Sequence, residues 1–472
     1  MWKKLSGAVG AGVLLAGVVP AGTAIAAGPV WTECKPGAVE LCTTMKVPLN
    51  WAKPTGPTTS LYVARVPARD QAHKLGTIVF NPGGPGGAGG SIFAEGLADY
   101  FMGALRDKYD LVSFDPRGTG SSSQLNCGPV LRPGVPVFPK SKAQYDAMVA
   151  SSRKTGEQCL KQHGDLMRNL DTRTAARDID AIRAALGERK ISFFGLSYGS
   201  FLGTIYAQMF PHRVDRMVLD GIVDHSQGSR RFMLEEAKSM ESEFDAFIDW
   251  CAAETTCALH GQDVGAVWDE TVRKADKTPL PGPSGPVTGD TMRMALPAML
   301  PQIAFFGDNR AELADALAKA AKGDGSGFLP SYLNNYETAY TAVSCMDLPG
   351  ELHGYADARA RLALAKAVAP RVGGAVEAWA MAASCSGWPI PPSNPWQRTP
   401  VHGAPPILIA SSSNDPSTPV SGARGLARQI DNSHLFIAPA HGHTAYLNSE
   451  CARTAITTYF LTGAMPARNA CG

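Results

Sequence analysis

Short apolar runs alternate with longer amphipathic segments over much of the chain. Runs with the hydrophobic pattern of β-strands occur at 43–47, 61–66, 77–80, 109–114, 191–194, 216–219, 406–410 and 435–437. Several are followed by stretches with helical character, such as 200–210. Continuous apolar strands that alternate with helices predict an α/β protein with a mostly parallel sheet and helices on both faces.

The middle of the chain has a different pattern. Between about residues 225 and 396 the strand-like runs disappear, and helical periodicity dominates, as at 232–253, 311–322 and 355–368. A proline-rich stretch at 278–286 interrupts this region, and a second proline cluster at 388–395 precedes the return of strands. We predict a sheet domain formed by 28–224 and 397–472, with an inserted, mainly helical cap at 225–396.

The N-terminal 27 residues resemble a secretory signal. Lys3 and Lys4 precede an apolar stretch that reaches about residue 20, and A-I-A follows at 24–26. A membrane anchor is the alternative, but this stretch is glycine-rich and shorter than the ~20 apolar residues of a span. We expect cleavage near Ala26 or Ala27 and a secreted, extracellular protein without membrane association.

Ten cysteines, an even number, fit the same compartment and predict disulfides. The sequence does not fix their connectivity, but their grouping favours neighbour pairs: Cys34–Cys42, Cys127–Cys159, Cys251–Cys257, Cys345–Cys385 and Cys451–Cys471. Metal binding is the alternative. The chain has no C-x-x-C pair and no zinc-like spacing, so we expect neither a metal nor another cofactor.

Charge narrows the range of partners. The chain has 44 basic and 42 acidic residues, a net charge near +2, and no basic tract that would attract a phosphate backbone. We therefore expect no nucleic-acid partner, and we expect the protein to be a monomer.

The most informative motif is the pentapeptide G-L-S-Y-G at 195–199, which directly follows an apolar strand-like run and precedes a helix-like stretch. This context predicts a nucleophile elbow, in which a strained turn lifts the hydroxyl of Ser197 clear of the sheet. A serine hydroxyl needs a base to take its proton, and a carboxylate must orient that base. After an elbow of this kind the acid and then the histidine follow along the chain.

Asp415 is the favoured acid, because it lies in a polar turn directly after the strand-like run 406–410. It could instead serve only to cap the helix that begins near Pro419. Asp431 is the nearest rival, but no strand precedes it. We therefore predict that Asp415 is the acid.

Three histidines follow Asp415 in the chain. His434 begins the last predicted strand, where its side chain would be fixed in the sheet. His441 and His443 lie in the segment that follows, which we interpret as a loop. We predict that His443, at the start of the final helix, is the base, and that His441 shapes the loop.

The oxyanion of an acyl-transfer intermediate needs two backbone donors. One is the amide after the nucleophile, that of Tyr198, and the other comes from a loop after an early strand. The segment 81–90 follows such a strand and contains six glycines in ten residues. A flexible linker or a phosphate-binding loop is the alternative, but the Lys and Ser/Thr of a Walker motif are missing.

These segments resemble the secreted tripeptidyl aminopeptidases and their proline iminopeptidase relatives, serine exopeptidases of the α/β-hydrolase fold. The similarity covers nearly the whole mature chain. Its motifs are N-P-G-G-P-G-G at 81–87, with Pro82 where the family has histidine, D-P-R-G-T-G-S-S at 115–122, the elbow, N-D-P at 414–416, G-H-T at 442–444 and C-S-G-W-P at 385–389. The resemblance implies a triad of Ser197, Asp415 and His443, with oxyanion amides from Gly84 and Tyr198.

The resemblance also implies a peptide substrate with a free N-terminus. An aminopeptidase must bind a protonated α-amine, so the cap should offer a carboxylate near the nucleophile. Candidates are Asp224, Glu235, Glu236 and Glu243, among which the sequence does not choose. A carboxylesterase with the same triad and a catalytically inactive binding protein are the alternative functions.

Overall fold

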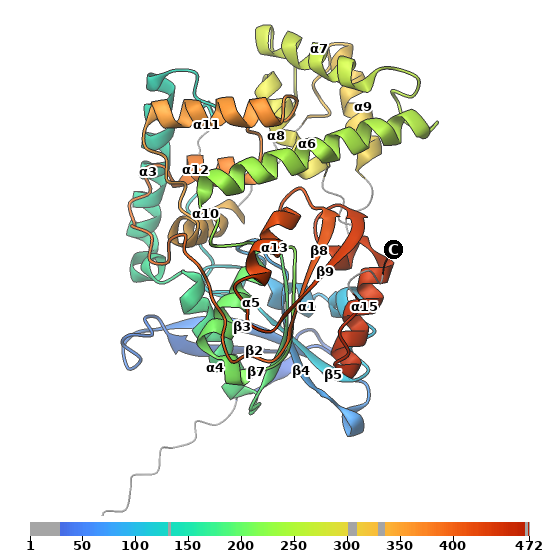
Figure 1. Ribbon diagram of the computed structural model, residues 1–472. Coiled ribbons are helices and arrows are strands. Elements are labelled where there is room, and N and C mark those ends of the chain that lie inside the picture. Colours follow the sequence, from blue (N-terminus) through green and yellow to red (C-terminus); the bar gives the residue numbers. More distant parts are fainter. Residues whose placement is uncertain (1–28, 131–133, 301–308, 329–335, 468–470, 472) are drawn as a thin grey trace, which may run out of the picture.

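The computed structural model describes residues 29–130, 134–300, 309–328, 336–467 and 471 (Figure 1). The segment predicted to be a signal peptide lies outside these residues. Within the described part of the chain, none of the helices combines the length and the apolar character needed to cross a bilayer.

Nine strands of the described residues form one sheet in the order β1-β2-β3-β5-β4-β6-β7-β8-β9. Pairing is antiparallel from β1 to β5 and parallel from β5 through β9. The strands are β1 Thr32–Glu33, β2 Leu41–Pro48, β3 Thr58–Val66, β4 Gly76–Asn81, β5 Tyr109–Phe114, β6 Ile191–Leu196, β7 Val214–Asp220, β8 Ile407–Asn414 and β9 Ser433–His441. The prediction of a mostly parallel α/β sheet is confirmed.

The sheet is covered on both faces, which explains its continuous apolar strands. Every residue of β5 and β6 is buried. One core contains residues of α1 Gly89–Ala94, α2 Ala98–Met102 and α15 Glu450–Thr462. The other contains residues of α4 Thr172–Ala185, α5 Tyr198–Met209 and α13 Val420–Ala427. A strand that is buried from both sides loses the polar alternation of a half-exposed strand.

Helices fill the chain between β7 and β8, and Figure 1 shows them gathered above the sheet. They are α6 Ser229–Ala253, α7 Val264–Lys277, α8 Gly289–Met299, α9 Arg310–Ala321, α10 Tyr336–Asp347, α11 Tyr355–Val368 and α12 Glu377–Cys385. We call them the cap. The earlier helix α3 Lys142–His163 packs against α11 and α12, so part of the sheet domain's chain joins this helical layer.

All five predicted disulfides are present: Cys34–Cys42, Cys127–Cys159, Cys251–Cys257, Cys345–Cys385 and Cys451–Cys471. Each joins cysteines at most 40 residues apart, which is why sequence grouping identified the partners. Five disulfides are consistent with an exported protein.

The D-P-R-G-T-G-S-S motif at 115–122 has a structural role, which its arginine supplies. Arg117 is 1% exposed and donates two hydrogen bonds to the buried carboxylate of Asp178, at 2.7 and 2.6 Å. Its remaining donors reach backbone carbonyls, including that of Leu49 at 2.8 Å. A charged pair with both partners fully buried requires this complete set of hydrogen bonds.

Candidate active site

Ser197 lies in the sharp turn between β6 and α5, with φ 57° and ψ −126°. A positive φ is uncommon for a residue other than glycine and is typical of a functional constraint. The amide of Ser197 donates to the carbonyl oxygen of Asp220 at 2.8 Å, which ties the turn to the end of β7. The predicted nucleophile elbow is therefore present in its expected position.

The glycines that flank Ser197 are required by close packing. A Cβ on Gly195 would lie 2.2 Å from the carbonyl oxygen of Gly199, and a Cβ on Gly199 would lie 2.6 Å from that of Asn81. These distances are far below a normal van der Waals contact. The two flanking positions therefore exclude a side chain.

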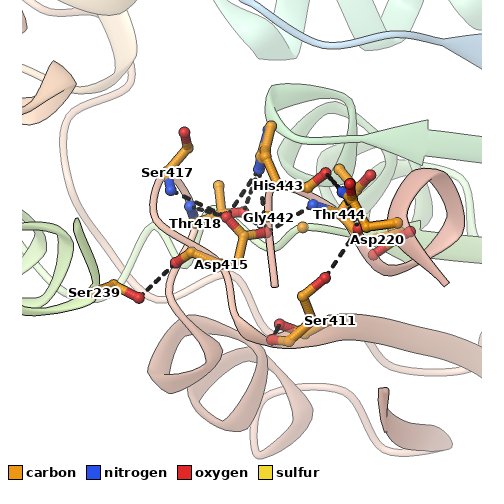
Figure 2. Close-up of polar contacts among 12 residues, drawn as sticks. Asp220, Ser239, Ser411, Asp415, Ser417, Thr418, Gly442, His443 and Thr444 are labelled. Atoms are coloured by element: carbon orange, nitrogen blue, oxygen red, sulfur yellow. Dashed lines mark hydrogen bonds and ion pairs between the residues drawn. The ribbon is translucent and has the colours of Figure 1, made fainter. Parts of the chain in front are cut away.

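Asp415 directly follows β8 in the turn that leads to α13, as predicted. Its carboxylate accepts hydrogen bonds from the amides of Ser417, Thr418 and Thr444 at 3.0, 2.9 and 3.0 Å, and from the Thr418 hydroxyl at 2.8 Å. Figure 2 shows these donors around the carboxylate. These bonds close the turn before α13 and do not cap it, because its N-cap is Pro419 and it has no side-chain cap. The carboxylate also has a second partner.

That partner is His443, whose Nδ1 lies 2.9 Å from Asp415 Oδ1 and 3.1 Å from Oδ2 (Figure 2). Burial alone would raise the pKa of Asp415, but the charge and hydrogen bond of His443 and the backbone amides around the carboxylate lower it. Burial opposes protonation of His443, yet the negative charge of Asp415, followed by Glu377 and Asp220, raises its pKa. The arrangement orients the imidazole and would stabilise the imidazolium ion that forms when His443 accepts a proton.

Asp220 connects the serine turn with the segment after His443. Its carbonyl accepts from Ser197, while its carboxylate accepts from the amides of Ala445 and Tyr446 at 2.8 and 2.7 Å. A Cβ on the adjacent Gly221 would lie 3.3 Å from His443 Cε1. The end of β7 thus contacts both the serine turn and the imidazole of His443, and no sequence pattern singles out Asp220 for this position. Burial raises the pKa of Asp220 to about 6.

The glycine-rich loop after β4 packs directly on the elbow. Gly83 has φ 99°, and a Cβ there would lie 2.8 Å from Ser197 Cβ and 3.3 Å from the Tyr198 amide nitrogen. Gly84, the next residue, has φ 113°. The loop therefore brings its backbone beside the nucleophile and the Tyr198 amide, where an oxyanion would form.

The rival residues lie elsewhere or have other partners. Asp431 is exposed and its carboxylate lies 2.9 Å from Nδ1 of the exposed His402. His434 pairs with Leu408 within the sheet. His441 is the last residue of β9 and does not belong to a loop after it, so that part of the interpretation was wrong. Strand pairing with β8 continues to Asn414 through a register shift, which the proline in this segment concealed.

The cap candidates for binding an amine differ sharply in their surroundings. Asp224 is buried and accepts from Ser226 and Gln429, while Glu235 lies partly exposed 3.2 Å from Lys238. Both have protein partners that account for them.

Glu236 is different, because its side chain is fully buried and one carboxylate oxygen has no hydrogen-bond partner in the described structure. The other oxygen accepts from the amide of Ala378 at 2.8 Å. Burial, and then the negative charge of Glu377, raise the pKa of Glu236 far above its usual range. An unpaired buried carboxylate oxygen is costly and indicates a place for an external donor.

Sequence reasoning missed Glu377, in the first turn of α12. Burial raises the pKa of Glu377, and its largest opposing effect is the positive charge of His443. Glu377 is therefore within electrostatic range of both Glu236 and the Asp415–His443 pair. A signal was available, because Glu377 is the only charged residue between Arg371 and Arg398.

The described residues include one group with three potential metal ligands close together, Cys127, Cys159 and His163, whose ligand atoms lie within 4.8 Å of one another. Cys127 and Cys159 form a disulfide, so neither offers a thiolate. This group lies in the α3 region of the fold and takes no part in the candidate active site.

Residues 76–450 match the family described as the alpha/beta hydrolase fold. A tripeptidyl aminopeptidase from Streptomyces coelicolor is 32% identical and aligns over 96% of this chain and 87% of its own length. The serine protease Hip1 of Mycobacterium tuberculosis is 28% identical, with 92% and 89% covered. Carboxylesterase B of the same organism is 29% identical, with 96% and 91% covered. The chain belongs to the α/β-hydrolase family that includes these tripeptidyl aminopeptidases, and it is a serine hydrolase.

Proposed function

We propose that this serine hydrolase is a secreted aminopeptidase that releases tripeptides from free N-termini, with Ser197, Asp415 and His443 as its triad. The observation that carries the proposal is the buried cap carboxylate of Glu236, one oxygen of which has no partner in the described structure. A second cap carboxylate, Glu377, acts electrostatically on both Glu236 and His443. The aminopeptidase relatives support the same conclusion.

In the first chemical step His443 takes the hydroxyl proton of Ser197 while Oγ attacks the scissile carbonyl carbon. Asp415 orients the imidazole and stabilises its positive charge. The amides of Gly84 and Tyr198 donate to the oxyanion of the tetrahedral intermediate. Collapse of the intermediate breaks the peptide bond, and His443 gives its proton to the departing amine.

The N-terminal fragment then remains as an ester on Ser197. A water molecule loses a proton to His443 and attacks this ester, and the second tetrahedral intermediate collapses to release the fragment with a free carboxylate. The proton returns from His443 to Ser197 Oγ. Both half-reactions therefore use the same base and the same oxyanion donors.

The cap carboxylates account for the demand for a free N-terminus. A protonated α-amine would donate to the unpaired oxygen of the buried Glu236 and to the partly exposed Glu377, which gives charge-assisted hydrogen bonds. An acylated N-terminus offers no such charge and leaves the carboxylates unpaired. The helices above the sheet would also restrict access by folded proteins.

A carboxylesterase is the second candidate, because a relative of similar identity has that name. Ester and amide hydrolysis pass through the same intermediate, so triad and oxyanion loop support both. The buried carboxylate of Glu236, with one oxygen unpaired, favours the aminopeptidase, since an uncharged acyl group would not pair with it.

A substrate panel tests the proposal. We expect the mature protein to cleave tripeptidyl anilides with a free amine, and to cleave aminoacyl, dipeptidyl and N-acetylated tripeptidyl anilides far more slowly. A serine-directed phosphonate should label the protein but not its Ser197→Ala variant. Fast turnover of short acyl esters with none of the free-amine anilides would establish the esterase instead.

A further inference from the structure

A single buried carboxylate on the cap helix α6 contacts two segments of the sheet domain. One is the acid turn, residues 414–419, and the other is the histidine segment, residues 441–444. Glu243 is 3% exposed, and its Oε1 lies 2.6 Å from Asn414 Nδ2, 3.1 Å from His441 Nδ1 and 3.4 Å from the Gly442 amide nitrogen. Asn414 immediately precedes Asp415, and Gly442 immediately precedes His443. One carboxylate oxygen thus contacts the chain next to the acid and next to the base.

A second contact lies one turn earlier on the same helix. The hydroxyl of Ser239 donates to the carbonyl oxygen of Asp415 at 2.7 Å, as Figure 2 shows. Residues four apart lie on one face of an α-helix, so Ser239 and Glu243 present this face to the acid turn together. The acid turn and the histidine segment also contact each other directly, because the Gly442 amide donates to the Asn414 carbonyl at 3.0 Å.

These contacts bear on the distance between Asp415 and His443. The two residues come from different strands, and their hydrogen bond depends on the relative position of the turn after β8 and the end of β9. Burying a carboxylate costs free energy unless it accepts hydrogen bonds, and Glu243 has donors from both segments. An apolar residue at this position would pack the helix without joining the segments.

We propose that Glu243 is a positioning residue for the hydrolytic reaction, whose carboxylate fixes the acid turn and the histidine segment to the cap helix. The proposal rests on the triad of the proposed function. It assigns Glu243 no contact with substrate, which separates it from Glu236 and Glu377.

Three variants test it, with Glu235→Gln as a matched control. Glu235 lies on the same helix, undergoes the same chemical change, and contacts only Lys238 among charged groups in the described salt bridges. Misplacing a catalytic group by about 1 Å costs roughly 100-fold in rate, so we expect Glu243→Ala to lower kcat by about that factor. KM should stay within about threefold, because substrate binding is not the function removed.

Glu243→Gln keeps an oxygen that can accept from Asn414 and Gly442 but loses the charge that faces His441. We expect it to retain more activity than Glu243→Ala, with kcat roughly tenfold below wild type. Ser239→Ala should lower kcat less, since Glu243 would still hold both segments. If Glu243→Ala fails to fold, these two variants carry the test.

Proton NMR supplies a readout that general loss of stability would not mimic. The Nδ1 proton shared by His443 and Asp415 should give a far-downfield resonance in the wild type and in Glu235→Gln, and this signal should weaken in folded Glu243→Ala. Wild-type kcat and an unchanged resonance in Glu243→Ala would overturn the proposal, as would a rise in KM with kcat preserved. Full activity in Ser197→Ala would instead refute the triad itself.

Discussion

Replacing Glu377 by glutamine gives the sharpest test of how the substrate's amine is recognised. The change keeps the size of the side chain and removes its negative charge. Glu377 lies in the first turn of α12, next to Ala378, whose amide binds Glu236, and within the electrostatic influence of His443. The variant therefore probes the bound ammonium group with little change in packing.

The size of the effect follows from the kind of interaction that is lost. A hydrogen bond to a charged group contributes about 1.5–3 kcal/mol, and each 1.4 kcal/mol is a factor of ten. We expect kcat/KM for a free-amine tripeptidyl anilide to fall roughly 10- to 150-fold in Glu377→Gln. The double variant with Glu236→Gln should lose more than either single variant, because both carboxylates share one ammonium group.

The assay compares the free-amine anilide with its N-acetylated form, using Glu235→Gln as the control for an acidic cap residue outside the site. The acetylated substrate never used the charge, so its kcat/KM should change little, and the ratio between the two substrates should collapse. An equal loss on both substrates would refute the reasoning, since Glu377 would then act through His443 alone.

Three further predictions concern the base, the elbow and the fold. His443 must be neutral to accept a proton, and its pKa is raised above the ordinary 6.5. With an acyl ester that has no amine, kcat/KM should therefore fall as the pH drops through a value above 6.5. An apparent pKa at or below 6.5 for this loss of kcat/KM would contradict the prediction. In Gly83→Ala the new Cβ would lie 2.8 Å from Ser197 Cβ, so kcat should drop at least about tenfold. Gly96→Ala, which has a similar φ but open space, should keep wild-type kcat. Arg117→Met leaves the buried carboxylate of Asp178 without its cation and should reduce the free energy of unfolding, measured in urea, by about 3–5 kcal/mol. A loss below about 1 kcal/mol would refute the assigned role.

The fold could be predicted from the sequence largely because its central strands are buried on both sides. An apolar run such as 109–114 coincides with β5 over its whole length, since nothing but a strand of that length fits the pattern. The two-residue strand β1 was missed because two residues carry no periodicity. The packing of α3 on α11 and α12 was missed as well, because it depends on contacts between segments far apart in the chain.

Sequence reasoning could locate the candidate site residues only where a known order along the chain, serine then acid then histidine, guides the search. Ser197, Asp415 and His443 follow loop signals at the carboxyl ends of strands, so their order and placement could be deduced. Asp220 and Glu377 come close to these residues only through the folding of distant segments, which no local pattern records. His441 was assigned to a loop because the apolar run that predicted the last strand ends at residue 437, yet β9 extends to His441 at the sheet edge.

The face of α6 that carries Glu236, Ser239 and Glu243 has a consequence for protein engineering. If both proposals hold, two turns of this helix carry one of the two amine-binding carboxylates and the residues that align the catalytic pair. Exchanging the cap for that of another hydrolase would change both properties at once, so a chimera should retain this stretch and its partners at Asn414 and His441. New specificities are better sought on α7, α8 and α9, which carry none of the residues assigned to the site.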